Sequence, residues 1–191
     1  MTDVVMITGS AGNLGHAVVD AFRARGARLV LLDRQRERLD QEYGPSDDTR
    51  LHVACDLLDA TAVAAATDEA VRAFGRIDVL CNLAGGFRMG PPVHETSDAD
   101  FSFLADLNAR TLLHTARAVV PRMLDAGGGR IVNVGAFAAQ KGAAGMGAYI
   151  AAKSAVIRLT ESMSAELRER NVNVNCVLPT VLDTPENRKA M

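Results

Sequence analysis

The amino-acid sequence predicts an α/β protein, a single domain over residues 1–191 in which a doubly wound parallel sheet lies between two layers of helices. Short apolar runs alternate along the chain with longer segments whose apolar residues recur at helical spacing. Parallel strands covered on both faces are almost continuously apolar, and strand–helix alternation with right-handed crossovers produces three layers. A chain of 191 residues is long enough to bury one continuous core.

Six short runs are predicted strands, because each is nearly continuously apolar and rich in β-branched residues. They are Val4–Thr8, Arg28–Leu32, Leu51–Cys55, Val79–Asn82, Arg130–Val134 and Val172–Val177. Helical spacing predicts four longer helices between them, at Asn13–Arg25, Thr61–Phe74, Phe101–Ala126 and Ala148–Arg170. Gly127–Gly129 ends the third helix, as glycine commonly does at a helix C-terminus. The basic run Arg34–Arg38 is interrupted by Glu37, and we interpret it as a solvated helix face.

Composition and charge argue against several classes of protein. The chain is 48% hydrophobic but only 4% aromatic, so its core is built from Ala, Val, Leu and Ile. The formal charge is −2 with both signs scattered along the chain, which gives no electrostatic footprint for nucleic acid or an anionic membrane. No apolar segment approaches the length of a membrane span, and Val4–Ile7 is too short for a signal peptide. We therefore expect a cytoplasmic protein.

The cysteines and histidines do not predict a metal site. Cys55, Cys81 and Cys176 lie within or at the end of predicted strands without metal-ligand spacing, which is typical of buried, reduced thiols in a cytosolic protein. The four histidines are isolated from one another in the sequence. We expect no bound metal.

The first candidate site is the turn Thr8-Gly9-Ser10-Ala11-Gly12-Asn13-Leu14-Gly15, which joins a strand to a helix. Its glycines allow a tight turn and let backbone N–H groups approach a pyrophosphate at the helix N-terminus. Asn13 stands where a third glycine is expected, and asparagine is among the residues that tolerate a positive φ. Any tight strand–helix turn uses glycine, so the motif alone is equally consistent with a structural turn.

Two acids that end strands are candidates for the adenosine half of a dinucleotide. Asp33 follows Gly15 by 18 residues, close to where an acid accepts from a ribose 2′-hydroxyl. Such an acid repels a 2′-phosphate and favours NAD(H), whereas its neighbour Arg34 could contact a phosphate, which keeps NADP(H) as the alternative. Asp56, followed by Leu57, could accept from an adenine amino group. Turn formation by Asp33 and helix capping by Asp56 are the structural alternatives.

Tyr149 and Lys153 are the candidate catalytic pair. They are four residues apart in a predicted helix and therefore share one face. A free tyrosine has a pKa of about 10, and a nearby ammonium favours the phenolate, which brings the phenol toward the range useful for acid–base catalysis. Such a pair is often accidental, and its position after a glycine-rich turn in a six-strand α/β pattern is what favours a function.

These motifs together resemble the short-chain dehydrogenase/reductase family over essentially the whole chain. The residues that carry the resemblance are Thr8–Gly15, Asp56, Cys81-Asn82-Leu83-Ala84-Gly85, Asn108, Tyr149-x-x-x-Lys153, and Asn175-x-x-x-Pro179 with Thr184. The resemblance implies a Rossmann-like domain that binds NAD(H) or NADP(H) and transfers a hydride to or from a small-molecule substrate.

The resemblance also implies a role for each matching residue. Tyr149 would protonate the reduced substrate atom, while Lys153 would hold the nicotinamide ribose and lower the Tyr149 pKa. Asn108 would support a proton relay, and Asn82 would brace the central strands. Ala84, Gly85 and Pro179 would border the cofactor, and Thr184 would reach its carboxamide. Family members commonly form a four-helix bundle between subunits, so we expect a homodimer or homotetramer through the helices at 101–126 and 148–170; the alternative is that these helices pack only on their own sheet.

The sequence departs from the family pattern in four places. Ala136, 13 residues before Tyr149, stands where the family has a substrate-polarising serine. Leu83 replaces the second Asn of an Asn-Asn-Ala-Gly motif, and Thr180 replaces the glycine that follows Pro179. The family's last helix and strand are missing beyond Met191, so we expect the sixth strand to be an apolar edge unless another segment covers it.

Ala136 has the largest chemical consequence, because a methyl group cannot donate to a developing oxyanion. Losing one such donor typically costs about 10²–10³ in rate, and an electron-poor substrate needs that donor less. Dihydropteridine reductases also lack the serine, and residues 178–189 and Ala84–Gly86 resemble their sequences, which suggests a quinonoid dihydropterin as substrate. The alternatives are a cofactor-binding protein without efficient catalysis, acting as a redox sensor or scaffold, and a chain that forms only a partial site.

The substrate pocket is expected in the loops after Gly85, after Ala136 and beyond Pro179. Candidate side chains there are Phe87, Arg88, Met89, Phe137 and Met146, for each of which core or surface packing is the alternative. The sequence does not identify the substrate.

Overall fold

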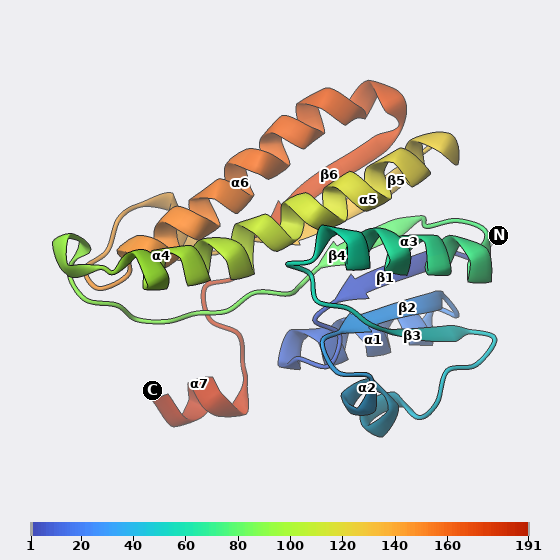
Figure 1. The fold of residues 1–191 in the computed structure, drawn as a ribbon, viewed down its shortest axis with the longest axis horizontal. Coiled ribbons are helices and arrows are strands. Elements are labelled where there is room, and N and C mark those ends of the chain that lie inside the picture. Colours follow the sequence, from blue (N-terminus) through green and yellow to red (C-terminus); the bar gives the residue numbers. More distant parts are fainter. Residues whose placement is uncertain (1, 191) are drawn as a thin grey trace.

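Six parallel strands form one sheet in the computed structural model, which describes residues 2–190. The strand order is β3-β2-β1-β4-β5-β6 (Figure 1). The bounds are Val4–Thr8 for β1, Arg28–Asp33 for β2, Arg50–Ala54 for β3, Val79–Asn82 for β4, Gly129–Val134 for β5 and Val172–Val177 for β6. Each predicted strand is confirmed to within one residue, as is the doubly wound α/β class.

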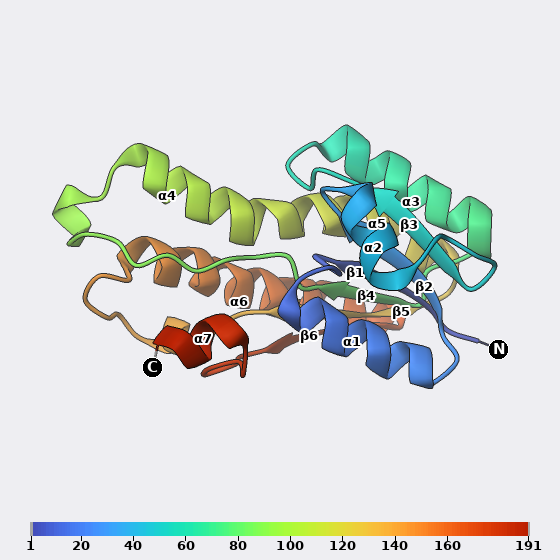
Figure 2. The ribbon, with the colours of Figure 1, turned by 90° about the horizontal axis from the view of Figure 1, so that it is seen from below.

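Seven helices are described between residues 2 and 190. They are α1 (Asn13–Ala24), α2 (Arg36–Tyr43), α3 (Ala60–Phe74), α4 (Asp98–Ala105), α5 (Thr111–Asp125), α6 (Gly147–Leu167) and α7 (Pro185–Ala190). Side chains of α3, α5 and α6 share a buried core with one face of the sheet, whereas α1 and α2 share a core with the other face. Figure 2 shows α3 and α5 on the opposite side of the strands from α1. None of these helices is long and apolar enough to cross a membrane.

The predicted helix over 101–126 is longer and less regular than its apolar spacing indicates. It begins at Asp98 because the Ser97 hydroxyl caps the backbone N–H of Asp100, and a π-helical turn at Asp106–Arg110 joins α4 to α5. A π turn inserts an extra residue into the helical repeat, and such turns are frequent at functional sites. Asn108 lies in this turn and is buried.

The edge strand β6 differs from the expected apolar edge. Its side chains alternate, so that Val172 and Val174 are buried while Asn173 and Asn175 are exposed. Val177 is the apolar residue that remains exposed, at 53%. The alternation places asparagine at the uncovered positions, and the prediction of an apolar edge is therefore wrong for most of the strand. Met191 lies outside the described residues.

A buried chain of polar side chains connects α5, β4, β5 and α6. The Thr115 hydroxyl donates to Asn82 Oδ1 at 2.9 Å, and Asn82 Nδ2 donates to Asn133 Oδ1 at 2.8 Å. Asn133 Nδ2 then donates to the Thr160 hydroxyl at 2.9 Å, which itself donates to the Val156 carbonyl. Because buried polar groups are costly when unpaired, these hydrogen bonds fix α5 and α6 relative to the central strands.

Replacing Asn133 with alanine should therefore destabilise the fold. The change leaves the Asn82 amide without its acceptor and the Thr160 hydroxyl without its donor, and we expect a loss of about 3 kcal/mol in the free energy of unfolding. Urea denaturation measures it. Asn173→Ala, the same change on the exposed side of β6, is the control and should cost under about 0.5 kcal/mol. Equal small losses for both would contradict the role of the buried chain.

Candidate active site

The turn between β1 and α1 is held by close backbone contacts. Gly9 has a φ of +63°, and a Cβ on it would lie 3.0 Å from the Ala84 Cα. A Cβ on Gly15 would lie 2.4 Å from the carbonyl oxygens of both Gly9 and Ser10. Asn13 has no positive φ, because it is the first residue of α1, and the reason expected for an asparagine there is therefore wrong. The turn leaves the N-terminus of α1 facing a cleft.

A cleft of about 540 Å³ runs along the carboxyl ends of the strands, from β2 to the segment after β6. Ten of the predicted site residues line it: Gly9, Asn13, Leu14, Gly15, Asp33, Ala84, Gly85, Tyr149, Lys153 and Pro179. Ligands of open α/β sheets bind in this position, outside the carboxyl ends of the strands. A glycine-lined helix N-terminus with an acid at one end of the cleft and a Tyr–Lys pair at the other fits an extended dinucleotide.

Seven predicted residues lie outside the lining of this cleft. Ser10 is buried, and its hydroxyl donates to the Leu32 carbonyl at 3.2 Å. Leu57, Asn82 and Asn108 border a small enclosed cavity beside the cleft. The other three, Arg34, Asp56 and Thr184, are treated next.

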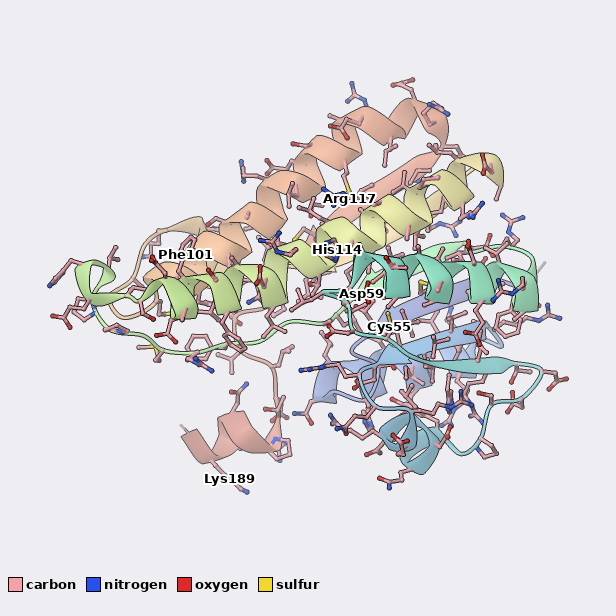
Figure 3. All side chains as sticks on the ribbon, viewed as in Figure 1. Cys55, Asp59, Phe101, His114, Arg117 and Lys189 are labelled. Atoms are coloured by element: carbon pink, nitrogen blue, oxygen red, sulfur yellow. The ribbon has the colours of Figure 1, made fainter. Side chains whose placement is uncertain are left out.

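Arg34 and Asp56 are exposed, and Thr184 is half-buried. The Asp56 carboxylate accepts from the Leu58 N–H. Asp59 instead accepts from two backbone N–H groups and caps α3, and Figure 3 labels it beside that helix. The alternative that Asp56 caps this helix is therefore wrong. The Thr184 hydroxyl accepts from the Asn187 N–H at the start of α7. Asn187, rather than Thr184, lines the cleft. Asn187 was not among the predicted site residues, because the sequence did not predict α7.

Asp33 is oriented at one end of the cleft by two backbone N–H groups. Its carboxylate accepts from Arg34 N at 2.8 Å and from Ala11 N at 3.3 Å. Arg38 also lines the cleft and donates to the Ala11 carbonyl at 2.8 Å. Arg38 could not be predicted from its place in a basic run, because its position depends on where α2 packs. Among the described residues that line the cleft, Asp33 and Arg38 are the charged groups at the end beside β2.

Tyr43 of α2 holds the turn from behind. Its hydroxyl donates to the Ser10 carbonyl at 2.6 Å, and its ring lies 5.4 Å from the His16 ring and 6.2 Å from the His52 ring. Burial raises the pKa of Tyr43 to about 12, so the hydroxyl keeps its proton. Arg38 donates to the Ala11 carbonyl in the same way, so the carbonyls of Ser10 and Ala11, which follow Gly9, each accept a hydrogen bond from α2. The two bonds tie the turn to α2.

The Tyr–Lys pair lies at the other end of the cleft. Lys153 is 6% exposed and donates to the Val134 carbonyl at 2.8 Å, and burial lowers its pKa to about 8. Burial also raises the pKa of Tyr149, the opposite of the expected lowering by Lys153. The physical reason is that the phenol is half-buried, and burial disfavours its charged form. The Tyr149 hydroxyl has no hydrogen-bond partner among the side chains and backbone that the structure describes, and the Tyr149 ring meets Phe87 edge to face at 4.9 Å.

Asn108 acts on the loop that borders this end of the cleft. Its side-chain oxygen accepts from Gly86 N at 3.1 Å, and its amide donates to the Gly86 carbonyl at 3.1 Å and to the Leu104 carbonyl at 2.9 Å. A Cβ on Gly85 would lie 2.8 Å from that oxygen and 3.2 Å from Lys153 Nζ. The π turn therefore places Asn108 where it fixes the loop after β4 beside the lysine.

Comparison with known proteins agrees with this architecture. A family model described as short chain dehydrogenase matches residues 3–191. D-threitol dehydrogenase of Mycolicibacterium smegmatis is 36% identical over 190 residues, which are 98% of this chain and 73% of that protein. The structure of NAD⁺-bound xylitol dehydrogenase superposes with a TM-score of 0.90 at 32% identity, covering 98% of this chain and 74% of the other. The NADP-bound structure of ElxO gives 0.92 at 25% identity, covering 99% and 77%.

The fold and its cleft define an NAD(P)-dependent oxidoreductase with a Rossmann-like domain. The chain belongs to the short-chain dehydrogenase family, as the resemblance of its motifs implied. Its solved relatives include proteins with NAD⁺ bound and with NADP bound, so the comparisons identify a nicotinamide cofactor without choosing between the two.

The Tyr43 contact predicts a specific loss of cofactor affinity. Tyr43→Phe keeps the ring beside His16 and His52 but removes the donor to the Ser10 carbonyl, and we expect NADH to bind about threefold to tenfold more weakly. Fluorescence titration with NADH measures this. Thr49→Val is a matched control, because it removes a hydroxyl donor to Asp47 on the same α2–β3 segment without touching the turn. An unchanged affinity in Tyr43→Phe would contradict the proposed effect on the turn.

Proposed function

We propose that the chain is an NAD(H)-favouring reductase in which Tyr149 supplies the proton and Lys153 holds the nicotinamide ribose. The observation that carries this is one cleft lined by the glycine turn, Asp33, Tyr149 and Lys153. When bound, the nicotinamide supplies or accepts the hydride. The Tyr149 hydroxyl is unpartnered and faces the same cleft, so it is available to protonate the substrate atom that gains charge. Asp33 supports NAD(H), and NADP(H) is the alternative because Arg38 lies beside it.

The substrate that we propose is uncharged and easily reduced. Among the described residues that line the cleft, the charged ones are Asp33, Arg38 and Lys153, and two of these lie at the adenosine end. Around Tyr149 the lining is mainly apolar: Phe87, Ala136, Ala138, Met146, Val181 and Leu182. Ala136 is 6% exposed and offers only a methyl group where the family has a serine. A quinonoid dihydropterin, which accepts a hydride readily, is one substrate of this kind.

A second candidate is a cofactor-binding protein without efficient catalysis, acting as a redox sensor or scaffold. Ala136 favours it, because the methyl group removes one donor to a developing oxyanion. Under this alternative, Ala136→Ser should create ketone reduction where the unmodified chain shows none. Rapid turnover by the unmodified chain would exclude it.

We propose a homodimer or homotetramer formed through α4, α5 and α6. Phe101 and Phe103 on α4 are exposed at 51% and 44%, which leaves apolar surface on this side of the molecule. Sedimentation equilibrium should give a mass of two or four chains. A monomer at all concentrations would show that these helices pack only on their own sheet.

Tyr149→Phe tests the catalytic assignment. Removing the hydroxyl should lower kcat by about 10²–10⁴ because the proton donor is lost, while NADH affinity should stay within about threefold because the ring remains. Steady-state assays with quinonoid dihydropterin and a parallel NADH titration measure both quantities. Unchanged turnover would remove Tyr149 from the mechanism.

The lowered pKa of Lys153 predicts how cofactor affinity depends on pH. A lysine is charged below its pKa, and burial lowers the pKa of Lys153 to about 8, so its ammonium loses the proton as pH rises through that value. We expect NADH affinity to fall between about pH 7 and pH 9. In Lys153→Arg the group stays charged, and the fall should vanish. An affinity that is constant up to about pH 10 would contradict the role of the charged lysine.

A further inference from the structure

Ala136 and Thr180, two positions at which the chain departs from the family pattern, lie on neighbouring segments of the backbone. The segment after β5 and the segment after β6 run side by side, with Gly135 N donating to the Val177 carbonyl at 2.9 Å and Phe137 N donating to the Pro179 carbonyl at 3.0 Å. Ala136 precedes the second donor, and Thr180 follows the second acceptor. Compared with the family pattern, Ala136 replaces a serine and lacks its hydroxyl, whereas Thr180 replaces a glycine and adds a hydroxyl.

Both residues border the same end of the cleft. Ala136 and Thr180 line it together with Tyr149, whereas Phe137, the intervening contact, does not. Ala136 has an extended backbone, with φ −155° and ψ 140°, and a buried methyl group. Thr180 is exposed toward the cleft, on the segment that leaves the sheet for α7 (Figure 1).

Thr180 also has a hydroxyl that is free to act. Among the described residues that line the cleft, the hydroxyl-bearing side chains are Tyr149 and Thr180, and neither hydroxyl has a hydrogen-bond partner. The nearby Ser154 cannot take this role, because its hydroxyl donates to the Ala139 carbonyl at 3.0 Å and it lies outside the lining. Among the described residues that line the cleft, Thr180 is therefore the one hydroxyl, besides that of Tyr149, that could donate to a substrate oxygen.

We propose that Thr180 is a catalytic residue whose hydroxyl donates to the substrate oxygen in place of the missing serine. This inference rests on the roles proposed above for Tyr149 and Lys153, and it replaces the argument that the missing serine leaves the substrate oxygen without a donor. In the reduction of a carbonyl, the carbon gains the hydride and forms a C–H bond, while the π electron pair of the carbonyl moves to oxygen. Tyr149 gives its proton to that oxygen, and the products are an alcohol and the oxidised nicotinamide. Thr180 transfers no proton; its hydrogen bond stabilises the developing charge.

The location of this donor has a consequence for the substrate. The serine position lies on a buried segment that follows β5, whereas Thr180 lies on the segment that leads to α7. A donor on this segment approaches the substrate from the side of β6, so the substrate oxygen is held between Tyr149 of α6 and the 178–184 segment. An activated ketone with apolar substituents, such as 1-phenyl-1,2-propanedione, matches the apolar side chains of the lining and serves as the probe.

The test is a double-mutant cycle on the two positions, with kcat for the dione and NADH affinity measured for each variant. Thr180→Val keeps the shape of the side chain and removes the hydroxyl, and it should lower kcat by about 10²-fold with NADH affinity within about threefold. Adding Ala136→Ser to Thr180→Val should restore at least about tenfold, because a hydroxyl returns to the same end of the cleft. Thr61→Val, at the exposed start of α3, is the matched control and should not change kcat.

Three outcomes would overturn the inference. Full turnover in Thr180→Val, alongside loss of turnover in Tyr149→Phe, would remove Thr180 while leaving the proposed function intact. A large gain from Ala136→Ser in the unmodified background would show that no donor had been supplied by Thr180. Bound NADH with no reduction by any variant would overturn the inference together with the proposed function.

Discussion

At the end of β1 the chain turns so tightly that a Cβ on Gly15 would overlap the carbonyl oxygens of Gly9 and Ser10. The same turn brings Gly9 against Ala84, two residues beyond the end of β4, so there is no room for a side chain at Gly9. Residues of this turn and of the first turn of α1 line the cleft at the strand ends. Tyr43 and Arg38 then fix the turn from the side of α2 by donating to its carbonyls.

The opposite end of the cleft depends on a different kind of constraint. Buried hydrogen bonds from Thr115 through Asn82 and Asn133 to Thr160 hold α5 and α6 on the central strands. Lys153 and Tyr149 lie on α6, one and nearly two turns from Val156, which accepts the last bond of this chain. The positions of Tyr149 and Lys153 therefore follow from polar packing in the core. At this end of the cleft, Ala136 lacks the hydroxyl that the family has on the segment after β5, and Thr180 carries one on the neighbouring segment after β6.

The sheet and most of the cleft could be predicted because they depend on local patterns. Apolar runs located the strands to within one residue, and the spacing from Gly15 to Asp33 located the acid. Predictions were wrong where packing decides the outcome. The raised pKa of Tyr149 follows from burial, which no sequence pattern reports, and Asp59 rather than Asp56 caps α3. Arg38 and Asn187 were missed because their contact with the cleft depends on how α2 and α7 pack, which no local sequence pattern indicates.

A direct titration tests whether the cleft binds a dinucleotide and whether Asp33 makes it prefer NAD(H). The chain contains no tryptophan, so the fluorescence of NADH can be followed with little background. We expect saturable binding of NADH and at least about tenfold weaker binding of NADPH, since Asp33 repels a 2′-phosphate. Tighter binding of NADPH would contradict the role of Asp33. No saturable binding of either dinucleotide by the 191-residue chain would contradict the cleft itself.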